Sequence, residues 1–252
     1  MKTVLITGAT SGIGWATALR FAGEEYRLVL TGRNKERLAE IEREVAARGA
    51  KCKTLNFDVR NYNEAAQALG TLEKEWAEID ILVNNAGGAL GLEPIDVGDV
   101  DDWNTMIDAN IKGLLYMTRL VVPGMRKRGR GHIINIGSVA GDAAYAGGGV
   151  YCATKSAVKA ITDGLRLDLV ETPIRVTNIK PGLVETNFSV VRFHGDKNRA
   201  SNVYKGIKPL TGDDIADVVS YVAEAPAHVQ VAEVLVLATH QANGSTIYRE
   251  IK

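Results

Sequence analysis

Short runs of apolar and β-branched residues recur along the whole chain and alternate with longer segments of helical period. Several of these runs have the length of a strand and contain few polar residues, a pattern typical of strands buried on both faces of a sheet. They occupy residues 3–7, 28–31, 52–57, 79–83, 132–136, 174–179 and 233–237. Because helical segments separate them, the pattern predicts parallel strands joined by crossover helices.

The intervening segments carry the period of amphipathic helices. In residues 34–49, Leu38, Ile41 and Val45 share one face while charged residues take the other. No internal repeat, low-complexity tract or long linker divides the chain. We therefore expect an α/β fold in which residues 1–252 form a single domain, a doubly wound parallel sheet of about seven strands with helices on both faces.

The composition agrees with one sizeable globular domain and narrows the function classes. Of the 252 residues, 46% are hydrophobic and 24% are charged. The 30 basic and 30 acidic residues cancel, so no large field would attract nucleic acid or an anionic membrane surface. The one basic cluster, formed by Arg126, Lys127, Arg128 and Arg130, is better explained as the solvated end of a helix. No apolar run approaches the roughly 18 residues that a membrane-spanning helix needs.

The cysteines and histidines argue against covalent crosslinks and catalytic metals. Cys52 and Cys152 lie far apart without CxxC spacing, which indicates neither a disulfide framework nor a zinc site and fits a reducing compartment. The histidines show no HExxH or HxxxH pattern, so we expect no catalytic metal. The first stretch, MKTVLITGAT, is too short for a signal-peptide core and is better explained as a strand. We therefore expect a cytoplasmic protein.

A glycine-rich loop, TGATSGIG at residues 7–14, follows the first predicted strand and opens the first predicted helix. A helix N-terminus offers unpaired N–H groups, and Gly8, Gly12 and Gly14 would let a pyrophosphate approach that backbone. The same glycines could merely form a tight turn between strand and helix. The position of the loop in the first strand–helix–strand unit favours dinucleotide binding and a Rossmann-like fold.

The end of the second predicted strand indicates which dinucleotide would bind. Folds of this kind usually place a carboxylate there for the adenosine ribose 2′-hydroxyl, but this sequence has Gly32 and Arg33. A guanidinium can bind a 2′-phosphate through charge-assisted hydrogen bonds, whereas a carboxylate would repel it. Arg33 therefore favours NADP(H) over NAD(H), unless it is an ordinary surface arginine at the start of a helix.

Tyr151 and Lys155 stand four positions apart in VYCATKSAV, at a glycine-rich helix start, and so share one helix face. A cation near the phenol would lower its pKa from about 10 toward neutrality, as a general acid–base acting on an alcohol or carbonyl requires. Alone, the pair could also be a half-buried aromatic beside a solvated lysine. However, Ser138 ends the fifth predicted strand, on the sheet edge where ligands bind, and its hydroxyl could reach the same carbonyl oxygen. Asn110, a poor residue for a helix interior, is a further candidate for a polar function.

These motifs together resemble the short-chain dehydrogenases/reductases, over nearly the whole chain. TGATSGIG, NNAG at 84–87, Asn110, Ser138, YCATK and PGLVET at 181–186 occur in the order of that family. The resemblance implies that Tyr151 is the acid–base and that Ser138 holds the substrate oxygen. It implies also that Lys155 binds the nicotinamide ribose while lowering the tyrosine pKa, and that Asn110 anchors a proton-relaying water. Hydride would move to or from the nicotinamide, so no metal is required.

The same resemblance assigns the NADP(H)-binding residues. NNAG would lie behind the adenine and its ribose, Asp58 and Val59 would flank the adenine, and PGLVET would hold the carboxamide. The complete predicted set is Gly8, Thr10, Ser11, Gly12, Ile13, Gly14, Arg33, Asn34, Asp58, Val59, Asn85, Ala86, Gly87, Tyr151, Lys155, Pro181, Gly182, Val184 and Thr186.

The segment 187–206, after the sixth predicted strand, lies where such folds usually form a lid over the active site. It carries several apolar residues, Phe188 and Phe193 among them, and one arginine between these, Arg192. A guanidinium binds a carboxylate bidentately, so Arg192 is a candidate clamp for an acidic substrate, beside Ser138 and Tyr151. A salt bridge or a subunit contact would explain the same arginine equally well.

Four further stretches are similar to a subgroup of the family, the NADP-dependent 3-hydroxy acid dehydrogenases. They are DILVNNAGGALGLEP, YAGGGVYCATK, VRFHGDK and STIYR. The similarity implies oxidation of the 3-hydroxyl of serine, allo-threonine or 3-hydroxyisobutyrate-like acids, or reduction of small 3-oxo acids such as malonic semialdehyde. It implies a homotetramer as well.

Three other functions stay open. A reductase of other carbonyls, such as 3-oxoacyl thioesters, simple ketones or steroids, would use the same residues. A sugar-nucleotide epimerase also uses a Tyr-x-x-x-Lys pair, although the glycine spacing here matches dehydrogenases better. A non-catalytic NADP(H) sensor could share the fold, but such sensors typically lack the tyrosine or the lysine.

Overall fold

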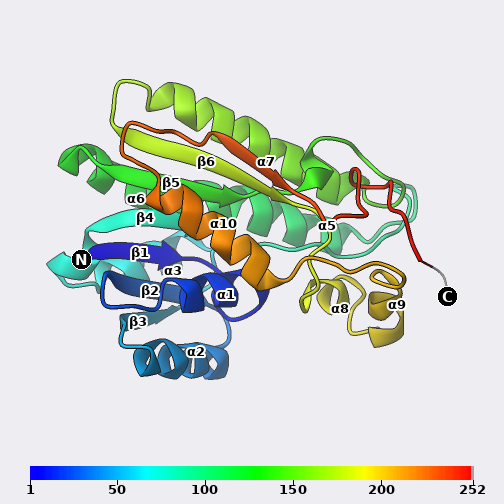
Figure 1. The fold of residues 1–252 in the computed structure, drawn as a ribbon, viewed down its shortest axis with the longest axis horizontal. Coiled ribbons are helices and arrows are strands. Elements are labelled where there is room, and N and C mark those ends of the chain that lie inside the picture. Colours follow the sequence, from blue (N-terminus) through cyan, green and yellow to red (C-terminus); the bar gives the residue numbers. More distant parts are fainter. Residues whose placement is uncertain (251–252) are drawn as a thin grey trace.

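The computed structural model describes residues 1–250 and is built on one seven-stranded sheet (Figure 1). Every neighbouring pair of strands is parallel, and the order is β3-β2-β1-β4-β5-β6-β7. The strands are β1 (Lys2–Ile6), β2 (Tyr26–Gly32), β3 (Lys51–Asn56), β4 (Ile79–Asn84), β5 (Gly131–Ile136), β6 (Ile174–Pro181) and β7 (Glu233–Val236). The order reverses between β1 and β4, which confirms the predicted doubly wound α/β sheet.

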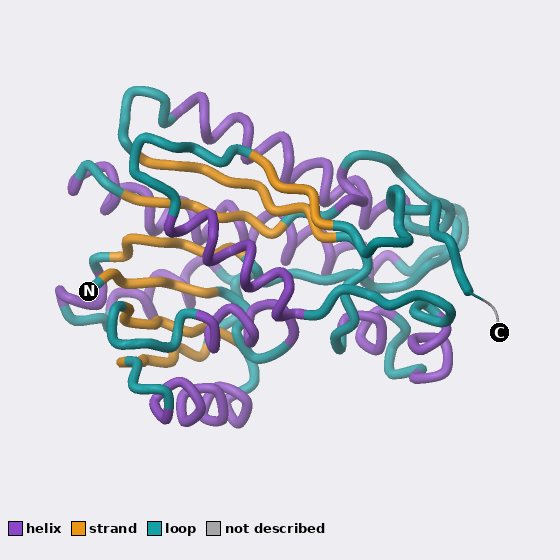
Figure 2. Tube along the Cα trace, viewed as in Figure 1, coloured by secondary structure: helices purple, strands orange, loops and turns teal. Residues whose placement is uncertain are grey.

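Helices cover both faces of the sheet, as predicted (Figure 2). One layer consists of α1 (Gly12–Arg20), α2 (Lys35–Ala47) and α10 (Gly212–Glu224); the other consists of α3 (Tyr62–Gly70), α6 (Leu114–Arg128) and α7 (Gly149–Asp168). Successive side chains of a strand point to opposite faces. In β4, Ile81 and Val83 accordingly join the first apolar core, whereas Leu82 joins the second. This double burial explains why the central strands are largely apolar.

The shorter elements complete the chain. They are α4 (Lys74–Ala77), α5 (Val100–Ile107), the π-helical turn η1 (Asp108–Gly113), the 3₁₀ turn η2 (Val139–Gly141), α8 (Phe188–Arg192) and α9 (Lys197–Asn202). In Figure 1 the strand arrowheads point toward α8 and α9, which lie beyond the carboxyl edge of the sheet. The segment 187–206 therefore lies at the edge where this type of sheet binds ligands.

Local signals in the sequence explain where the helices begin and end. Leu38, Ile41 and Val45 are buried on one face of α2, as the spacing predicts. The helix α10 begins with a capping box in which Thr211 and Asp214 bond each other's backbone N–H. The helix α6 ends at Gly129, which has a positive φ of 61°, and its last turn carries three residues of the basic cluster. The prediction that these cations belong to a helix end is confirmed.

The strand boundaries differ from the predicted ones by two residues at most. The largest difference at a site-forming end is in β6, which continues through Lys180 and Pro181 to pair with β7. The apolar run that predicted this strand ends at residue 179, because the next residue, Lys180, is charged. Within residues 1–250, no helix is long and apolar enough to cross a membrane, and no group of three potential metal ligands is found. Both cysteines are free.

We expect the replacement Leu82→Ala in β4 to lower the free energy of unfolding by about 2–5 kcal/mol, since it would leave a cavity in a fully buried site. Urea denaturation followed by circular dichroism measures the change. Leu167→Ala is the matched control, because that side chain is 74% exposed on α7. Equal losses in the two variants would contradict the assignment of Leu82 to the core.

Candidate active site

A cleft of about 540 Å³ runs along the carboxyl ends of the strands. Most of the predicted site residues line it, and they come from the loops after six strands and from α7. The lining includes Gly8, Thr10, Ser11, Gly12, Ile13, Arg33, Asp58, Val59, Asn85, Ala86, Gly87, Ser138, Tyr151, Lys155, Pro181, Gly182, Val184, Thr186 and Arg192. The volume falls in the range typical of cofactor and substrate sites.

Three predicted residues, Gly14, Asn34 and Asn110, do not line this cleft. A Cβ at Gly14 would collide with the Gly8 carbonyl and the Asn85 amide, so this glycine lets α1 pack against the loop. The Asn34 side chain caps α2 by accepting the Arg37 N–H at 2.8 Å. Gly14 and Asn34 thus support the cleft from behind, and their predicted contact with the cofactor stays a prediction.

The glycine loop presents its backbone to the cleft. Gly8 and Gly12 have positive φ values of 66° and 55°, which few other residues adopt. Asn85 donates to the carbonyls of Thr7 and Gly8 at 2.9 and 3.1 Å and so holds the loop in place. Ser11, the N-cap of α1, makes no side-chain hydrogen bond to the first turn. The first N–H groups of α1 are thus available to a phosphate, which agrees with dinucleotide binding.

The far end of the cleft has the charges that a 2′-phosphate requires. Arg33 is largely exposed, and its Nη1 lies 3.9 Å from Asp58 Oδ2. Asp58 is already paired with Arg60 through hydrogen bonds of 2.7 and 3.0 Å. Although burial alone would raise it, the pKa of Asp58 is held below its usual range by Arg60 and by the charge of Arg33. Because Arg60 neutralises this carboxylate, Arg33 can meet another anion; the sequence analysis did not single out Arg60.

The three reactive side chains meet at the end of β5. Ser138 follows this strand, and its Oγ accepts the Ala140 N–H at 3.1 Å, which caps η2. Tyr151 and Lys155 face the same place from one turn of α7, and both are more than nine-tenths buried. Lys155 donates from Nζ to the Ile136 carbonyl at 2.8 Å. Cys152 is buried in a small apolar cluster, as expected for a packing residue.

The pKa values of Tyr151 and Lys155 are both shifted by burial. Burial raises the pKa of Tyr151 above its ordinary value, and the neighbouring Tyr145 adds to this, while Ser138 and the charge of Arg192 oppose it. Burial also lowers the pKa of Lys155 to about 8. The ammonium is directed at the Ile136 carbonyl, and its Nζ is 6.0 Å from the centroid of the Tyr151 ring. Lys155 is not among the main groups that lower the pKa of this phenol here, and its predicted effect on Tyr151 stays a prediction.

Asn110 joins two parts of the site from behind. It lies in the π-helical turn η1 and is 2% exposed. Its side chain exchanges two hydrogen bonds with the backbone of Gly88, at 2.8 and 2.9 Å, and donates to Thr154 at 2.9 Å. It thus fixes the loop after β4 against α7, and π-helical turns are frequent at such functional places. Its role in proton relay stays a prediction.

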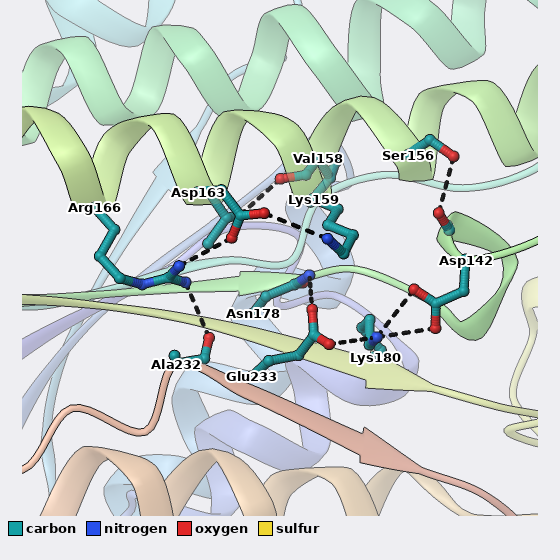
Figure 3. A network of polar contacts seen from close by, with 12 residues as sticks. Asp142, Ser156, Val158, Lys159, Asp163, Arg166, Asn178, Lys180, Ala232 and Glu233 are labelled. Atoms are coloured by element: carbon teal, nitrogen blue, oxygen red, sulfur yellow. Dashed lines mark hydrogen bonds and ion pairs between the residues drawn. The ribbon is translucent and has the colours of Figure 1, made fainter.

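A buried lysine near the end of β6, Lys180, bridges two carboxylates from other parts of the chain (Figure 3). Its Nζ contacts Asp142 at 2.9 Å and Glu233 at 2.6 Å, and its side chain is only 6% exposed. Asp142 follows η2, Glu233 begins β7, and Lys180 precedes Pro181, so the ion pairs connect the Ser138 turn with the loop after β6. The sequence analysis missed this group because its members are far apart along the chain.

A second residue that the sequence analysis missed is Gln241. It is 5% exposed and accepts the Leu183 N–H at 2.8 Å. A Cβ at Gly182 would collide with its side-chain oxygen, so this glycine and the glutamine fit together. The loop at residues 181–186, which is predicted to hold the carboxamide, is therefore fixed in part by a residue from the C-terminal part of the chain.

The segment 187–206 closes one side of the cleft. The Phe188 ring packs edge-on against the Tyr151 ring, with centroids 5.8 Å apart. Arg192 donates from Nε to the Gly91 carbonyl at 2.9 Å and from Nη1 to the Tyr145 hydroxyl at 3.0 Å. Its Nη2 is buried without a hydrogen-bond partner, and no acidic residue among 1–250 pairs with it. The alternative of a salt bridge within this part of the chain is thereby excluded.

Comparisons with known proteins agree with this geometry. A model of the family described as short chain dehydrogenase matches residues 2–196. The NADP-dependent 3-hydroxy acid dehydrogenase YdfG of Salmonella typhi is 48% identical over 98% of this chain and 99% of its own. The NADP-dependent 3-hydroxy acid dehydrogenase of Schizosaccharomyces pombe is 43% identical over 99% and 97% of the two chains.

The fold has equally similar counterparts among solved structures. The closed form of a serine dehydrogenase complexed with NADP⁺ has a TM-score of 0.92 and 46% identity, covering 98% of this chain and 100% of that chain. Serine dehydrogenase from Escherichia coli has a TM-score of 0.82 and 43% identity, covering 95% and 99%. The chain belongs to the short-chain dehydrogenase family, as its motifs predict.

Proposed function

We propose that the protein is an NADP(H)-dependent oxidoreductase that acts on the 3-hydroxyl or 3-oxo group of small acids, such as serine, allo-threonine or malonic semialdehyde. The observation that carries the proposal is the placement of Arg192, a cation without an acidic partner among residues 1–250, in the same cleft as Tyr151 and Ser138. The relatives named NADP-dependent 3-hydroxy acid dehydrogenases and serine dehydrogenase support the same substrate class.

The residues of the cleft fit NADP(H). The glycine loop and the free N–H groups of α1 suit the pyrophosphate, and Arg33 suits the 2′-phosphate. Lys155 and the loop from Pro181 to Thr186 line the other end, where they would hold the nicotinamide ribose and carboxamide. When bound, the nicotinamide supplies or accepts the hydride.

The protein's part in the reaction is proton transfer and orientation. Because burial raises its pKa, the Tyr151 phenol carries a proton at neutral pH and can donate it to a carbonyl oxygen held by Ser138. In the oxidative direction the deprotonated form of the same group, a phenolate, would take the hydroxyl proton. Lys155, with its pKa lowered to about 8, can change its charge near neutral pH and so follow the proton.

The proposal includes three broader features. The single domain 1–252 would use the segment 187–206 as a lid, since Phe188 shields the Tyr151 ring from solvent. The family resemblance favours a homotetramer, and the two free cysteines fit a cytoplasmic location. The alternative substrate class, larger neutral carbonyls, is favoured only by the apolar cleft residues Phe188 and Val191.

Replacing Arg33 with alanine should lower the ratio of kcat/KM for NADP to kcat/KM for NAD by about tenfold or more, because a charge-assisted contact to the 2′-phosphate is lost. Steady-state kinetics with the two cofactors measure the ratio. Arg43→Ala on α2 removes the same charge from an exposed position and is the control. An unchanged ratio in Arg33→Ala would count against NADP recognition by this residue.

Replacing Tyr151 with phenylalanine should reduce kcat by about a hundredfold or more, because the proton donor is removed. NADPH binding, followed by its fluorescence, should remain, since the ring still packs against Phe188. Tyr221→Phe, at a position 67% exposed on α10, is the control for the loss of a hydroxyl. A wild-type protein that bound NADPH but turned over no carbonyl or alcohol would instead be a sensor.

Replacing Arg192 with leucine should raise KM for serine-like acids by about tenfold or more, because a charge-assisted hydrogen bond to the carboxylate is lost. KM for neutral secondary alcohols should change far less. Arg199→Leu removes a cation from the same segment, where Arg199 covers the Phe193 ring, and is the control. Equal effects on acids and alcohols would remove Arg192 from the substrate site and favour a reductase of neutral carbonyls.

A further inference from the structure

The guanidinium of Arg192 is held by two segments that are distant from it in the sequence. Its Nε bonds the Gly91 carbonyl in the loop after β4, and its Nη1 bonds the Tyr145 hydroxyl in the loop before α7. Gly91 donates its own N–H to the Arg192 carbonyl at 2.9 Å, so the first loop and α8 are joined twice. Because a guanidinium is a rigid planar fork, fixing Nε and Nη1 also fixes the direction of Nη2.

Nη2 is the group for which the protein provides no partner. It is buried, and no atom among residues 1–250 accepts a hydrogen bond from it. A buried charged donor without an acceptor is costly, so the arrangement favours a ligand that brings an anionic oxygen. The guanidinium carbon lies 5.7 Å from the centroid of the Tyr151 ring. Such a ligand would therefore need only a few bonds between its anionic group and the carbon that reacts.

The Tyr145 ring is seated by the glycine run that precedes α7. A Cβ at Gly148 would overlap this ring, and the Gly148 N–H donates to the Tyr145 carbonyl at 3.0 Å. Gly147 adopts a positive φ of 71° beside the Leu92 carbonyl. Gly147 and Gly148 thus allow the chain to place an aromatic ring directly against the start of α7. Burial raises the pKa of Tyr145, which keeps its phenol neutral beside the cation.

We propose that Tyr145 is a positioning residue for substrate selection: it holds Arg192 so that Nη2 meets the carboxylate of a substrate whose reacting oxygen lies at Tyr151 and Ser138. The inference rests on the proposed function of the cleft. The loop that ends in Tyr145 leads directly into the helix that carries Tyr151, so it also sets the spacing between the anion site and the acid–base. Tyr145 acts through Arg192, and a neutral substrate makes no use of it.

The test compares 3-hydroxybutyrate with its neutral amide, which has the same shape but no charge. Tyr145→Phe keeps the ring against Gly148 and removes only the hydroxyl that accepts from Nη1. We expect the acid-to-amide ratio of kcat/KM to fall about tenfold, through KM for the acid more than through kcat. A purely structural effect would lower kcat/KM for the acid and for the amide by the same factor. Tyr221→Phe is the control, and thermal unfolding with NADPH binding verifies that each variant is folded.

A double-mutant cycle with Arg192→Leu separates the possible outcomes. If Tyr145 acts through Arg192, the double variant should have the same acid-to-amide ratio as Arg192→Leu alone. A ratio that Tyr145→Phe leaves unchanged, or losses that simply add, would overturn the role of Tyr145 while the carboxylate site at Arg192 stands. A wild-type protein without any preference for the acid would overturn the proposed substrate class itself, and the role of Tyr145 with it.

Discussion

The hydrogen bond from Lys155 Nζ to the Ile136 carbonyl is the contact on which the geometry of the cleft depends. It joins α7 to the end of β5 two residues before Ser138, and so sets the phenol of Tyr151 against the serine hydroxyl. A carbonyl oxygen only partly replaces the water that a buried ammonium loses, which is why the pKa of Lys155 falls to about 8. Burial at this contact therefore brings the pKa of this ammonium closer to neutral.

Uncharged amide side chains hold the surrounding loops. Asn85 bonds the glycine loop, Asn110 bonds Gly88 after β4, and Gln241 bonds the loop after β6. An amide both donates and accepts, so it satisfies backbone groups at the sheet edge without adding a charge. These amides therefore hold the loops without placing further charges beside Arg33 and Arg192, which line the cleft.

The fold and several residues that line the cleft were predictable, because the sequence patterns that indicate them are short and local. The apolar runs located the strands, and the glycine loop, Ser138 and Tyr151 followed from short spacings. Most residues that the sequence did not reveal bond across long separations: Tyr145 to Arg192 over 47 positions, Lys180 to Asp142 over 38 and Gln241 to Leu183 over 58. Arg60, which bonds Asp58 two positions away, is the exception. The raised pKa of Tyr151 was not predictable for a related reason. Its main cause is burial, which depends on the whole fold and not on a neighbour one helical turn away.

A buried cation, Lys180, and a partly buried one, Arg192, show at this sheet edge how a structural charge differs from a charge proposed to bind a ligand. Lys180 is 6% exposed and contacts two carboxylates, so the fold itself balances its charge (Figure 3). Arg192 has only a carbonyl and a phenol as partners, and its Nη2 has none among residues 1–250. Because burying an unbalanced charge costs free energy, such a charge is better explained by a bound anion than by stability. The contrast places Lys180 in the framework and supports the proposal that Arg192 meets the substrate.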